Sequence, residues 1–268
     1  MSRLTGPIKR IARRAAYPAL ATGMVLSTVV AGLNHSSYLV QATGTTAALK
    51  AVAPLASPAN STAANTASLA TTAGLDLDLK HAKIDQWVTR LTTSLRGDFS
   101  TSLSRMDKYA GMINAKLDAK QMPRELIYLA LIESDFNPNA KSKVGAVGMW
   151  QFMSATARQL GLTVKGKTDE RKNPAESTDA ALSYLSDLHD RFGSWYLAAA
   201  AYNSGAGTVS KALMKVTGKT QGTDEDFFRI LSALPRETQD YVPKLIASAR
   251  VGSNPAQYGM DGGTAAAN

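Results

Sequence analysis

One acid, Glu133, and one amide, Gln151, are the residues of this chain best suited to do chemistry together. Glu133 ends an apolar run over residues 126–132, and Gln151 follows in a glycine-rich stretch, 141–151, that contains no acid. A carboxyl group among apolar side chains resists ionisation, which suits a general acid that works near neutral pH. The pairing predicts cleavage of a glycosidic bond by a single acid/base.

A second carboxylate is the feature that most glycosidases would add to Glu133. Asp135 lies two positions further on, roughly 200° around a helix, so it cannot share the face of Glu133. Three acids later in the chain remain open as partners by sequence distance: Asp169, Glu170 and Glu176. The shortage of nearby acids favours a mechanism that needs only one carboxylate of the protein.

Helical periodicity dominates the chain from about residue 81, and no clear alternating strand is found. A stripe beginning with Ile84, Trp87 and Val88 is typical of an amphipathic helix, and proline and glycine mark most of the later helix ends. The pattern predicts helices over about 81–95, 99–117, 123–135, 154–161, 174–193, 194–205, 224–231 and 237–250. We therefore expect a mainly α domain in which an apolar helix positions Glu133.

The composition excludes several classes of site. The 268 residues include no cysteine, which removes disulfides, thiolate metal sites, cysteine nucleophiles and a lipid-modified cysteine. The spacing of metal-ligand residue types indicates no metal, and nothing indicates another cofactor. The net charge is +9, but no basic helix with interleaved aromatics is present, so no nucleic acid is expected as a partner.

Four segments are predicted along the chain. Basic residues precede an uncharged apolar run over 15–33, so residues 1–42 are expected to be a signal peptide or a membrane anchor. Residues 43–80, rich in Ala, Thr, Ser and Pro, are expected to be a disordered linker. A folded domain over 81–250 and a flexible tail over 251–268 complete the organisation. Cleavage and retention of the N-terminal segment both remain open.

Several ordered motifs of the domain resemble a known family. They are Glu133-Ser134 through Gly148 to Gln151, then Ala201-Tyr202-Asn203, then Leu234-Pro235-Arg236-Glu237-Thr238 with Tyr241-Val242-Pro243. Together they closely resemble the signature of SLT-type lytic transglycosylases, and the last is most similar to the branch of membrane-bound lytic murein transglycosylase D. The resemblance covers roughly residues 85–250. It implies a lysozyme-like helical fold and cleavage of the MurNAc–GlcNAc β-1,4 bond of peptidoglycan.

The resemblance also implies the roles of individual residues. Glu133 would first protonate the leaving oxygen, the 2-acetamido group of MurNAc would assist, and Glu133 would then deprotonate the C6 hydroxyl to close a 1,6-anhydro ring. An intramolecular nucleophile explains why no second acid is needed. The implied substrate-binding residues are Ser134, Gly148, Met149, Gln151, Tyr202, Asn203 and Tyr241.

Two other functions remain open. A muramidase of similar fold would need an acid from residues 169–176 to activate water. A non-catalytic glycan-binding component of a secretion or conjugation apparatus would need none.

The expected partner is the glycan strand of peptidoglycan, and the expected location is the periplasm, either free or anchored to the inner membrane through the N-terminal segment. No protein partner can be inferred. Many members of the resembled branch carry an N-terminal lipid and wall-binding repeats; neither is expected here, so local wall opening is an alternative to general wall turnover.

Overall fold

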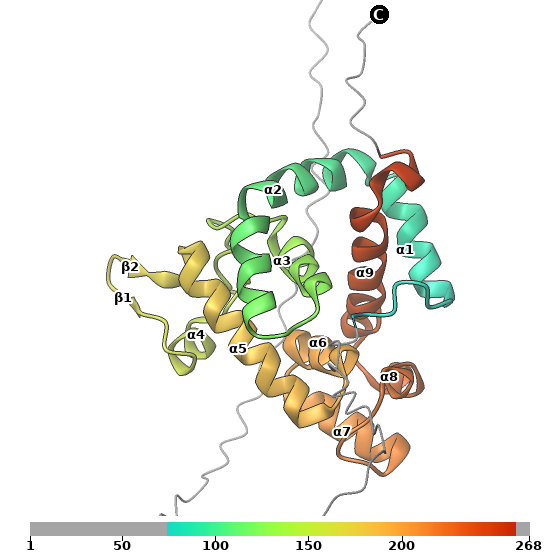
Figure 1. Ribbon diagram of the computed structural model, residues 1–268. Coiled ribbons are helices and arrows are strands. Elements are labelled where there is room, and N and C mark those ends of the chain that lie inside the picture. The colour runs from blue at the N-terminus through green and yellow to red at the C-terminus, as the bar shows by residue number, and fades with distance from the viewer. Residues whose placement is uncertain (1–73, 261–268) are drawn as a thin grey trace, which may run out of the picture. The chain divides into compact units, whose positions relative to one another are not determined.

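The computed structural model describes residues 74–260, which form a mainly α domain (Figure 1). The predicted signal or anchor segment, the linker up to residue 73 and the tail from residue 261 lie outside the described residues. Within the described part the sheet consists of two short antiparallel strands, β1 (Val164–Lys165) and β2 (Thr168–Asp169). The prediction of a mainly α domain with little or no β-sheet is confirmed for these residues.

Most helices follow one another with short connections. In chain order the helices are α1 (Ala82–Thr92), α2 (Arg96–Ala119), η1 (Arg124–Leu126), α3 (Ile127–Ser134), α4 (Ser154–Gln159), η2 (Glu170–Lys172), α5 (Pro174–Phe192), α6 (Trp195–Ser204), α7 (Ala206–Thr217), α8 (Asp224–Ile230), η3 (Leu231–Ala233), α9 (Arg236–Ser253) and η4 (Pro255–Tyr258), where η denotes a 3₁₀ helix. The longest connection, residues 135–153 between α3 and α4, contains the glycine-rich loop.

Capping residues set the boundaries of α5 and α6. Asn173 caps α5 by accepting hydrogen bonds from the first free backbone N–H groups, and Pro174 occupies the first helical position. Gly193 ends α5 in the left-handed conformation at φ 75°. The Ser194 hydroxyl then caps α6. These predicted boundaries are confirmed.

Helix α7 is the main element that the periodicity did not predict. It begins directly after Gly205, which the sequence indicates only as the end of α6. Its buried face consists of Val209, Ala212 and Leu213, which do repeat at helical spacing. Because a single glycine with φ 84° serves both helices, the break between them is too short to resemble a loop.

The apolar helix that carries Glu133 is the central element of the domain. Residues 127–131 of α3 are all buried, and α3 contacts both α2 and α9 (Figure 1). It is shorter than predicted, because Pro123 has an extended ψ of 130° and the chain first forms the turn η1. Asp135, with φ 53°, ends α3 in the left-handed conformation, so Glu133 lies in its last turn.

Packed residues extend beyond both predicted domain boundaries. Leu75 is 5% exposed, and the guanidinium of Arg250 donates hydrogen bonds to the carbonyls of Leu77 and Leu79. At the other end α9 continues to Ser253, and Met260 is buried. The boundaries predicted at residues 80 and 251 are therefore corrected, because alternating leucines before α1 and a buried methionine after η4 pack on the domain.

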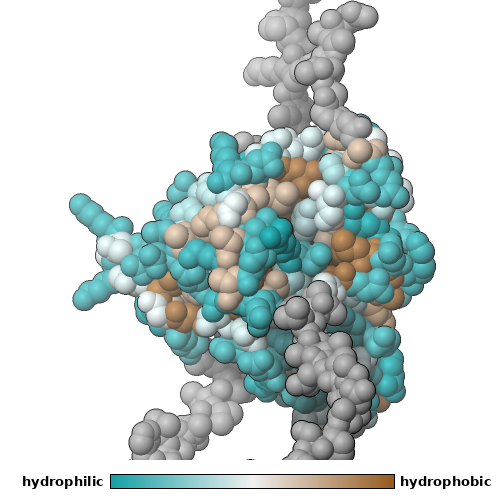
Figure 2. Space-filling view, in the orientation of Figure 1, coloured by the Kyte–Doolittle hydropathy of each residue, from teal (hydrophilic) through white to brown (hydrophobic). Residues whose placement is uncertain are grey.

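Hydrophilic residues predominate on the face drawn in Figure 2, where apolar residues form smaller patches between them. The hairpin connecting β1 to β2 presents exposed lysines, Lys165 and Lys167, at its tip. Within residues 74–260, none of the helices has the length and apolar content needed to cross a bilayer.

Candidate active site

Glu133 and Tyr241 form the centre of the site. Glu133 lies partly buried in the last turn of α3, and the phenol Oη of Tyr241, on α9, donates a hydrogen bond of 2.6 Å to its Oε1. The two residues are 108 positions apart in sequence. Packing of α3 on α9 thus brings the predicted acid together with one predicted binding residue.

The surroundings of Glu133 favour a neutral carboxyl group. Burial raises its pKa from 4.5 to about 7, while the hydrogen bond from Tyr241 and the charge of Lys244 act in the opposite direction, and Glu237 adds a smaller upward effect. A carboxyl group with this pKa is present in both forms near neutral pH. It can therefore both donate and accept a proton, which is what an acid/base that acts twice requires.

Two charged residues of α9 near Glu133 were not predicted, Glu237 and Lys244. With Tyr241 they lie at i, i+4 and i+7, which places all three on one face of the helix. Burial raises the pKa of Glu237 and lowers that of Lys244, while the charges of Asp135 and Glu133 oppose the decrease for Lys244. The helical spacing could have indicated this face, but only the tertiary structure shows that it meets the end of α3.

Asn203 links the end of α6 to the same part of α9. Its Nδ2 donates a 2.8 Å hydrogen bond to Glu237 Oε1, and its Oδ1 accepts one of 2.7 Å from the hydroxyl of Thr238. Both ends of the amide are therefore bound by neighbouring residues of α9. This arrangement fixes the orientation of Asn203 and holds the carboxylate of Glu237 in place.

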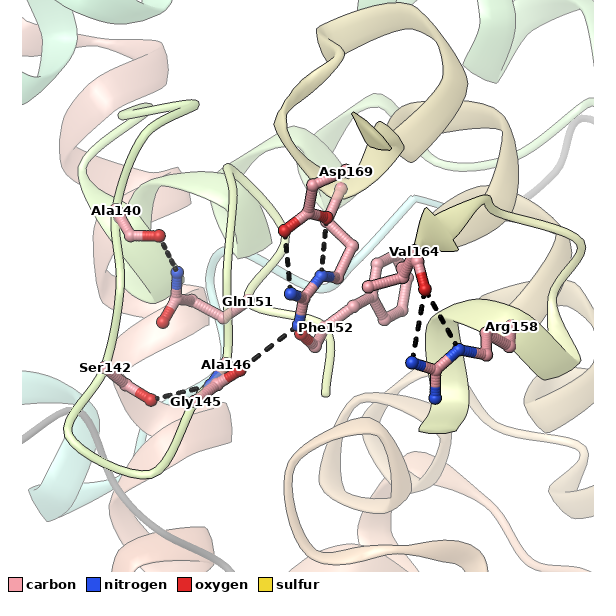
Figure 3. A network of polar contacts seen from close by, with 10 residues as sticks. Ala140, Ser142, Gly145, Ala146, Gln151, Phe152, Arg158, Val164 and Asp169 are labelled. Carbon is pink, nitrogen blue, oxygen red and sulfur yellow. Dashed lines mark hydrogen bonds and ion pairs between the residues drawn. The ribbon is translucent and has the colours of Figure 1, made fainter. Parts of the chain in front are cut away.

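The glycine-rich loop is held by three residues that the resemblance implies to bind substrate. Successive main-chain carbonyls accept side-chain hydrogen bonds as follows: Gly148 from Gln151 Nε2 at 2.7 Å, Met149 from Ser134 Oγ at 2.7 Å, and Trp150 from Tyr202 Oη at 2.8 Å. Gln151 also contacts the carbonyl of Ala140, as Figure 3 shows. These side chains thus fix the backbone of the loop close to Glu133.

The structure places Met149 differently from the prediction. Its side chain is 0% exposed and belongs to the hydrophobic core. A fully buried side chain offers no surface to a ligand, so the prediction that Met149 touches the sugar is corrected. Its main-chain carbonyl, bound by Ser134, is the part of this residue that contributes to the loop.

Gly148 is required for a close approach of two backbones. Its φ is 89°, and a Cβ atom added there would lie 1.8 Å from the main-chain oxygen of Arg171. Gly145 has a similar φ of 92°, but an added Cβ would meet no atom within 4 Å. Of these two glycines, only Gly148 is therefore required by a close approach of another backbone segment.

The acids left open as partners of Glu133 are engaged elsewhere or exposed. Asp169 forms an ion pair with Arg171, and Glu170 Oε2 accepts a hydrogen bond from the backbone N–H of Thr163. Glu176 is exposed in the first turn of α5. The additional carboxylate that acts electrostatically on Glu133 is Glu237. In the part of the chain that the structure describes, no three His, Cys, Asp or Glu residues are grouped as metal ligands.

The part of the chain that contains Glu133 matches a known family model. Residues 111–224 match the family model described as Transglycosylase SLT domain. This part of the chain is therefore similar to transglycosylase SLT domains. The SLT domain match contains Glu133, the glycine-rich loop, Tyr202 and Asn203, while Tyr241 lies beyond its end.

Similar proteins agree with this assignment. The chain is 39% identical over 157 residues to membrane-bound lytic murein transglycosylase D of Escherichia coli, an alignment that covers 58% of this chain and 34% of that protein. It is 35% identical over 145 residues to peptidoglycan transglycosylase gp16 of Escherichia phage T7, with 53% of this chain and 10% of that protein covered. The chain thus spans about a third of the first relative and a tenth of the second.

A solved structure of lytic transglycosylase Slt from Pseudomonas aeruginosa, an inactive mutant, is also similar. The superposition has a TM-score of 0.44 at 25% sequence identity and covers 55% of this chain and 24% of that chain.

Proposed function

We propose that this protein is a peptidoglycan lytic transglycosylase that cleaves the MurNAc–GlcNAc β-1,4 bond without water. The observation that carries the proposal is the carboxyl group of Glu133, with a pKa of about 7 and a hydrogen bond from Tyr241, inside an SLT domain. The similarity to proteins named murein and peptidoglycan transglycosylases supports the choice of substrate.

The first half of the reaction needs Glu133 in its protonated form. The carboxyl group gives its proton to the glycosidic oxygen, the bond from that oxygen to C1 of MurNAc breaks, and the GlcNAc hydroxyl leaves. The carbonyl oxygen of the 2-acetamido group forms a bond to C1 and takes up the developing positive charge. Burial, which keeps about half of the Glu133 carboxyl groups protonated at pH 7, therefore favours this step.

The second half protonates Glu133 again, with a proton from the sugar. The carboxylate accepts the proton of the C6 hydroxyl, O6 bonds to C1, and the bond from C1 to the acetamido oxygen breaks, which gives the 1,6-anhydro end. The hydrogen bond from Tyr241 and the charge of Lys244 stabilise the carboxylate between the two halves. An intramolecular hydroxyl has a high effective concentration, so no second carboxylate is needed to activate water.

A muramidase is the alternative that one observation favours, because Glu237 adds a carboxylate close to Glu133. Its Oε1 is bound by Asn203, and burial raises its pKa, which makes it a weaker candidate for a base that must be ionised. The products distinguish the two reactions. Digestion of purified sacculi followed by mass spectrometry of the muropeptides should give 1,6-anhydroMurNAc ends, and reducing MurNAc ends would establish the muramidase instead.

The proposed substrate also indicates where the protein acts. Peptidoglycan lies in the periplasm, and the first relative is named as membrane-bound. We therefore propose that the protein is exported to the periplasm and that residues 1–42 serve as a signal peptide or as an anchor in the inner membrane, followed by a linker to the SLT domain.

Replacing Tyr241 by phenylalanine should shift the pH dependence of the reaction. The hydrogen bond from Tyr241 lowers the pKa of Glu133, so its loss raises that pKa further. A general acid works only while protonated, so the alkaline limb of kcat/KM should move to higher pH, by about one unit for a hydrogen bond to a charged group. The measurement is a pH profile of the release of anhydro muropeptides.

A matched control for this variant is Tyr196→Phe. The hydroxyl of Tyr196 donates to the main-chain carbonyl of Asp76, so this change also removes a phenol hydrogen bond, but one that does not involve Glu133. Its profile should keep the wild-type midpoint. An alkaline limb that stays in place or moves to lower pH in Tyr241→Phe would contradict the assigned role of Tyr241.

A further inference from the structure

Arg171 is a buried charged residue that the proposed mechanism does not use. It lies in η2, directly after the β1–β2 hairpin, and is 5% exposed. Its guanidinium makes a two-pronged contact with Asp169, from Nε to Oδ1 and from Nη2 to Oδ2, each at 2.8 Å. This geometry is the strong form of an arginine–carboxylate pair. The Arg171 guanidinium also holds the pKa of Asp169 below its usual range.

The remaining nitrogen of the guanidinium, Nη1, contacts the first and the last residue of segment 145–152, which contains most of the glycine-rich loop. Nη1 donates to the carbonyl of Gly145 at 3.1 Å and to that of Phe152 at 3.0 Å. Figure 3 shows Asp169, Phe152 and Gly145 gathered around this network. The backbone N–H of Val147 also donates to the carbonyl of Phe152, at 3.0 Å. Arg171 therefore closes the loop at its base.

The backbone of Arg171 supports the same loop from a second direction. Its main-chain oxygen occupies the space that the missing Cβ of Gly148 leaves open. The side chain thus holds residues 145 and 152, and the main chain packs against residue 148 between them. Ser134, Gln151 and Tyr202 bind the carbonyls of residues 148–150. All of these contacts restrain one short segment next to Glu133.

We infer that Arg171 is a positioning residue for substrate binding, which holds residues 145–152 in the shape that receives the glycan strand. The inference rests on the proposed function, because the loop contains Gly148 and Gln151, two of the substrate-binding residues that the resemblance implies. Arg171 affects substrate binding only through the loop. The carboxylate of Asp169 pairs with the buried guanidinium and balances its charge. Neither side chain needs to touch the substrate.

Arginine is specifically suited to this role. Its planar guanidinium presents several donors in a fixed arrangement: Nε and Nη2 pair with Asp169, while Nη1 is directed to the carbonyls of Gly145 and Phe152. A lysine at the same place would keep the charge but could not pair with Asp169 and span both carbonyls. Arg171→Lys therefore tests geometry with the charge retained, while Asp169→Asn leaves the guanidinium in place and removes the charge of its partner.

Glycan binding without turnover is the first measurement. In a Glu133→Gln background, Arg171→Lys should weaken the binding of a GlcNAc–MurNAc tetrasaccharide by about tenfold or more, measured by calorimetry, since small misplacements of a site have effects of this size. Asp169→Asn should weaken binding in the same direction. The matched control is Arg158→Lys, because Arg158 is an exposed arginine whose guanidinium donates hydrogen bonds to the carbonyl of Val164, outside the glycine-rich loop (Figure 3).

Two readouts separate positioning from a general loss of structure. Hydrogen exchange should become faster in peptides that cover residues 141–153 in Arg171→Lys, while peptides of α5 and α9 keep their protection. In the active enzyme the change should appear mainly in KM, and the pH midpoint of kcat/KM should stay in place, because no contact of Glu133 is altered.

The outcomes distinguish this inference from the proposed function. If the Glu133→Gln protein binds the tetrasaccharide and the folded Arg171→Lys variant binds it equally well, the positioning role is overturned alone. If the Glu133→Gln protein does not bind the glycan and the wild type releases no anhydro products, the proposed function is overturned and this inference with it. Weaker binding in both Arg171→Lys and Asp169→Asn, with Arg158→Lys unchanged, supports the role.

Discussion

Replacing Glu133 by glutamine is expected to lower kcat/KM by at least ~10²–10⁴-fold while the fold is kept, the usual contribution of a general acid. Glutamine has nearly the same shape and can still accept the hydrogen bond from Tyr241, but it can neither give nor take the proton that the reaction needs. The measurement is the rate of release of anhydro muropeptides from sacculi by the purified variant. Near-wild-type turnover would refute the assignment of Glu133.

Asp135→Asn is the matched control, because it neutralises another acid two residues away. The carboxylate of Asp135 accepts a 2.8 Å hydrogen bond from Ser102 on α2, whereas that of Glu133 accepts one from Tyr241 on α9. Asparagine can accept the same bond. We expect kcat/KM to stay within about threefold of wild type, since asparagine keeps the bond and only its charge assistance is lost, at a contact that does not involve Glu133.

The Glu133→Gln variant should also differ from wild type in stability. Between pH 4.5 and about 7 the folded protein keeps a proton on Glu133 that the unfolded chain has lost, so the free energy of unfolding falls as the pH rises through this range. Glutamine removes that dependence. Above pH 7 the variant should therefore be more stable than wild type, by on the order of 1–3 kcal/mol, which urea titrations at pH 5 and pH 8 can measure.

Replacing Gly148 by alanine should have the second large effect. An added Cβ would lie 1.8 Å from the main-chain oxygen of Arg171, and φ at this position is 89°. Because backbone atoms cannot rotate away as a side chain can, either the loop or η2 must shift. We expect the free energy of unfolding to fall by roughly 3 kcal/mol or more and kcat/KM to fall about a hundredfold, as for a misplaced site.

Gly145→Ala separates the two causes of this effect. Its φ of 92° imposes a similar conformational strain, but the new Cβ would meet nothing within 4 Å. The variant should lose only about 1–2 kcal/mol, the usual cost of such strain. Unfolding midpoints in urea and muropeptide release give both quantities. Equal losses in the two variants would show that contact with Arg171 is not what requires glycine at position 148.

Helix positions followed closely from local sequence patterns. The cap at Asn173, the glycine at 193 and the serine at 194 each act on the backbone within a few residues, so their effect could be predicted without knowing the rest of the fold. Helix α7 was missed because its start depends on the same glycine that ends α6. The ends of the packed domain were misplaced because the burial of Leu75 and Met260 depends on distant partners.

The candidate acid and its loop also followed from sequence, because an isolated carboxyl group on an apolar helix is a local feature. Glu133, its apolar surroundings and the nearby glycines are adjacent in the chain, and the family resemblance rests on the same short motifs. The raised pKa expected from these surroundings agrees with the value of about 7. By itself the sequence determined the mainly α fold class and the candidate acid, because both depend on residues close together in the chain.

Tertiary structure decided what surrounds that acid. Tyr241, Glu237 and Lys244 approach Glu133 because α9 packs on α3, more than a hundred residues away in the chain. Met149 proved to be core, and Arg171 proved to hold the loop, because burial and hydrogen-bond partners depend on which helices meet. Local patterns specify which residues could react, whereas packing between distant elements determines their pKa values and their partners.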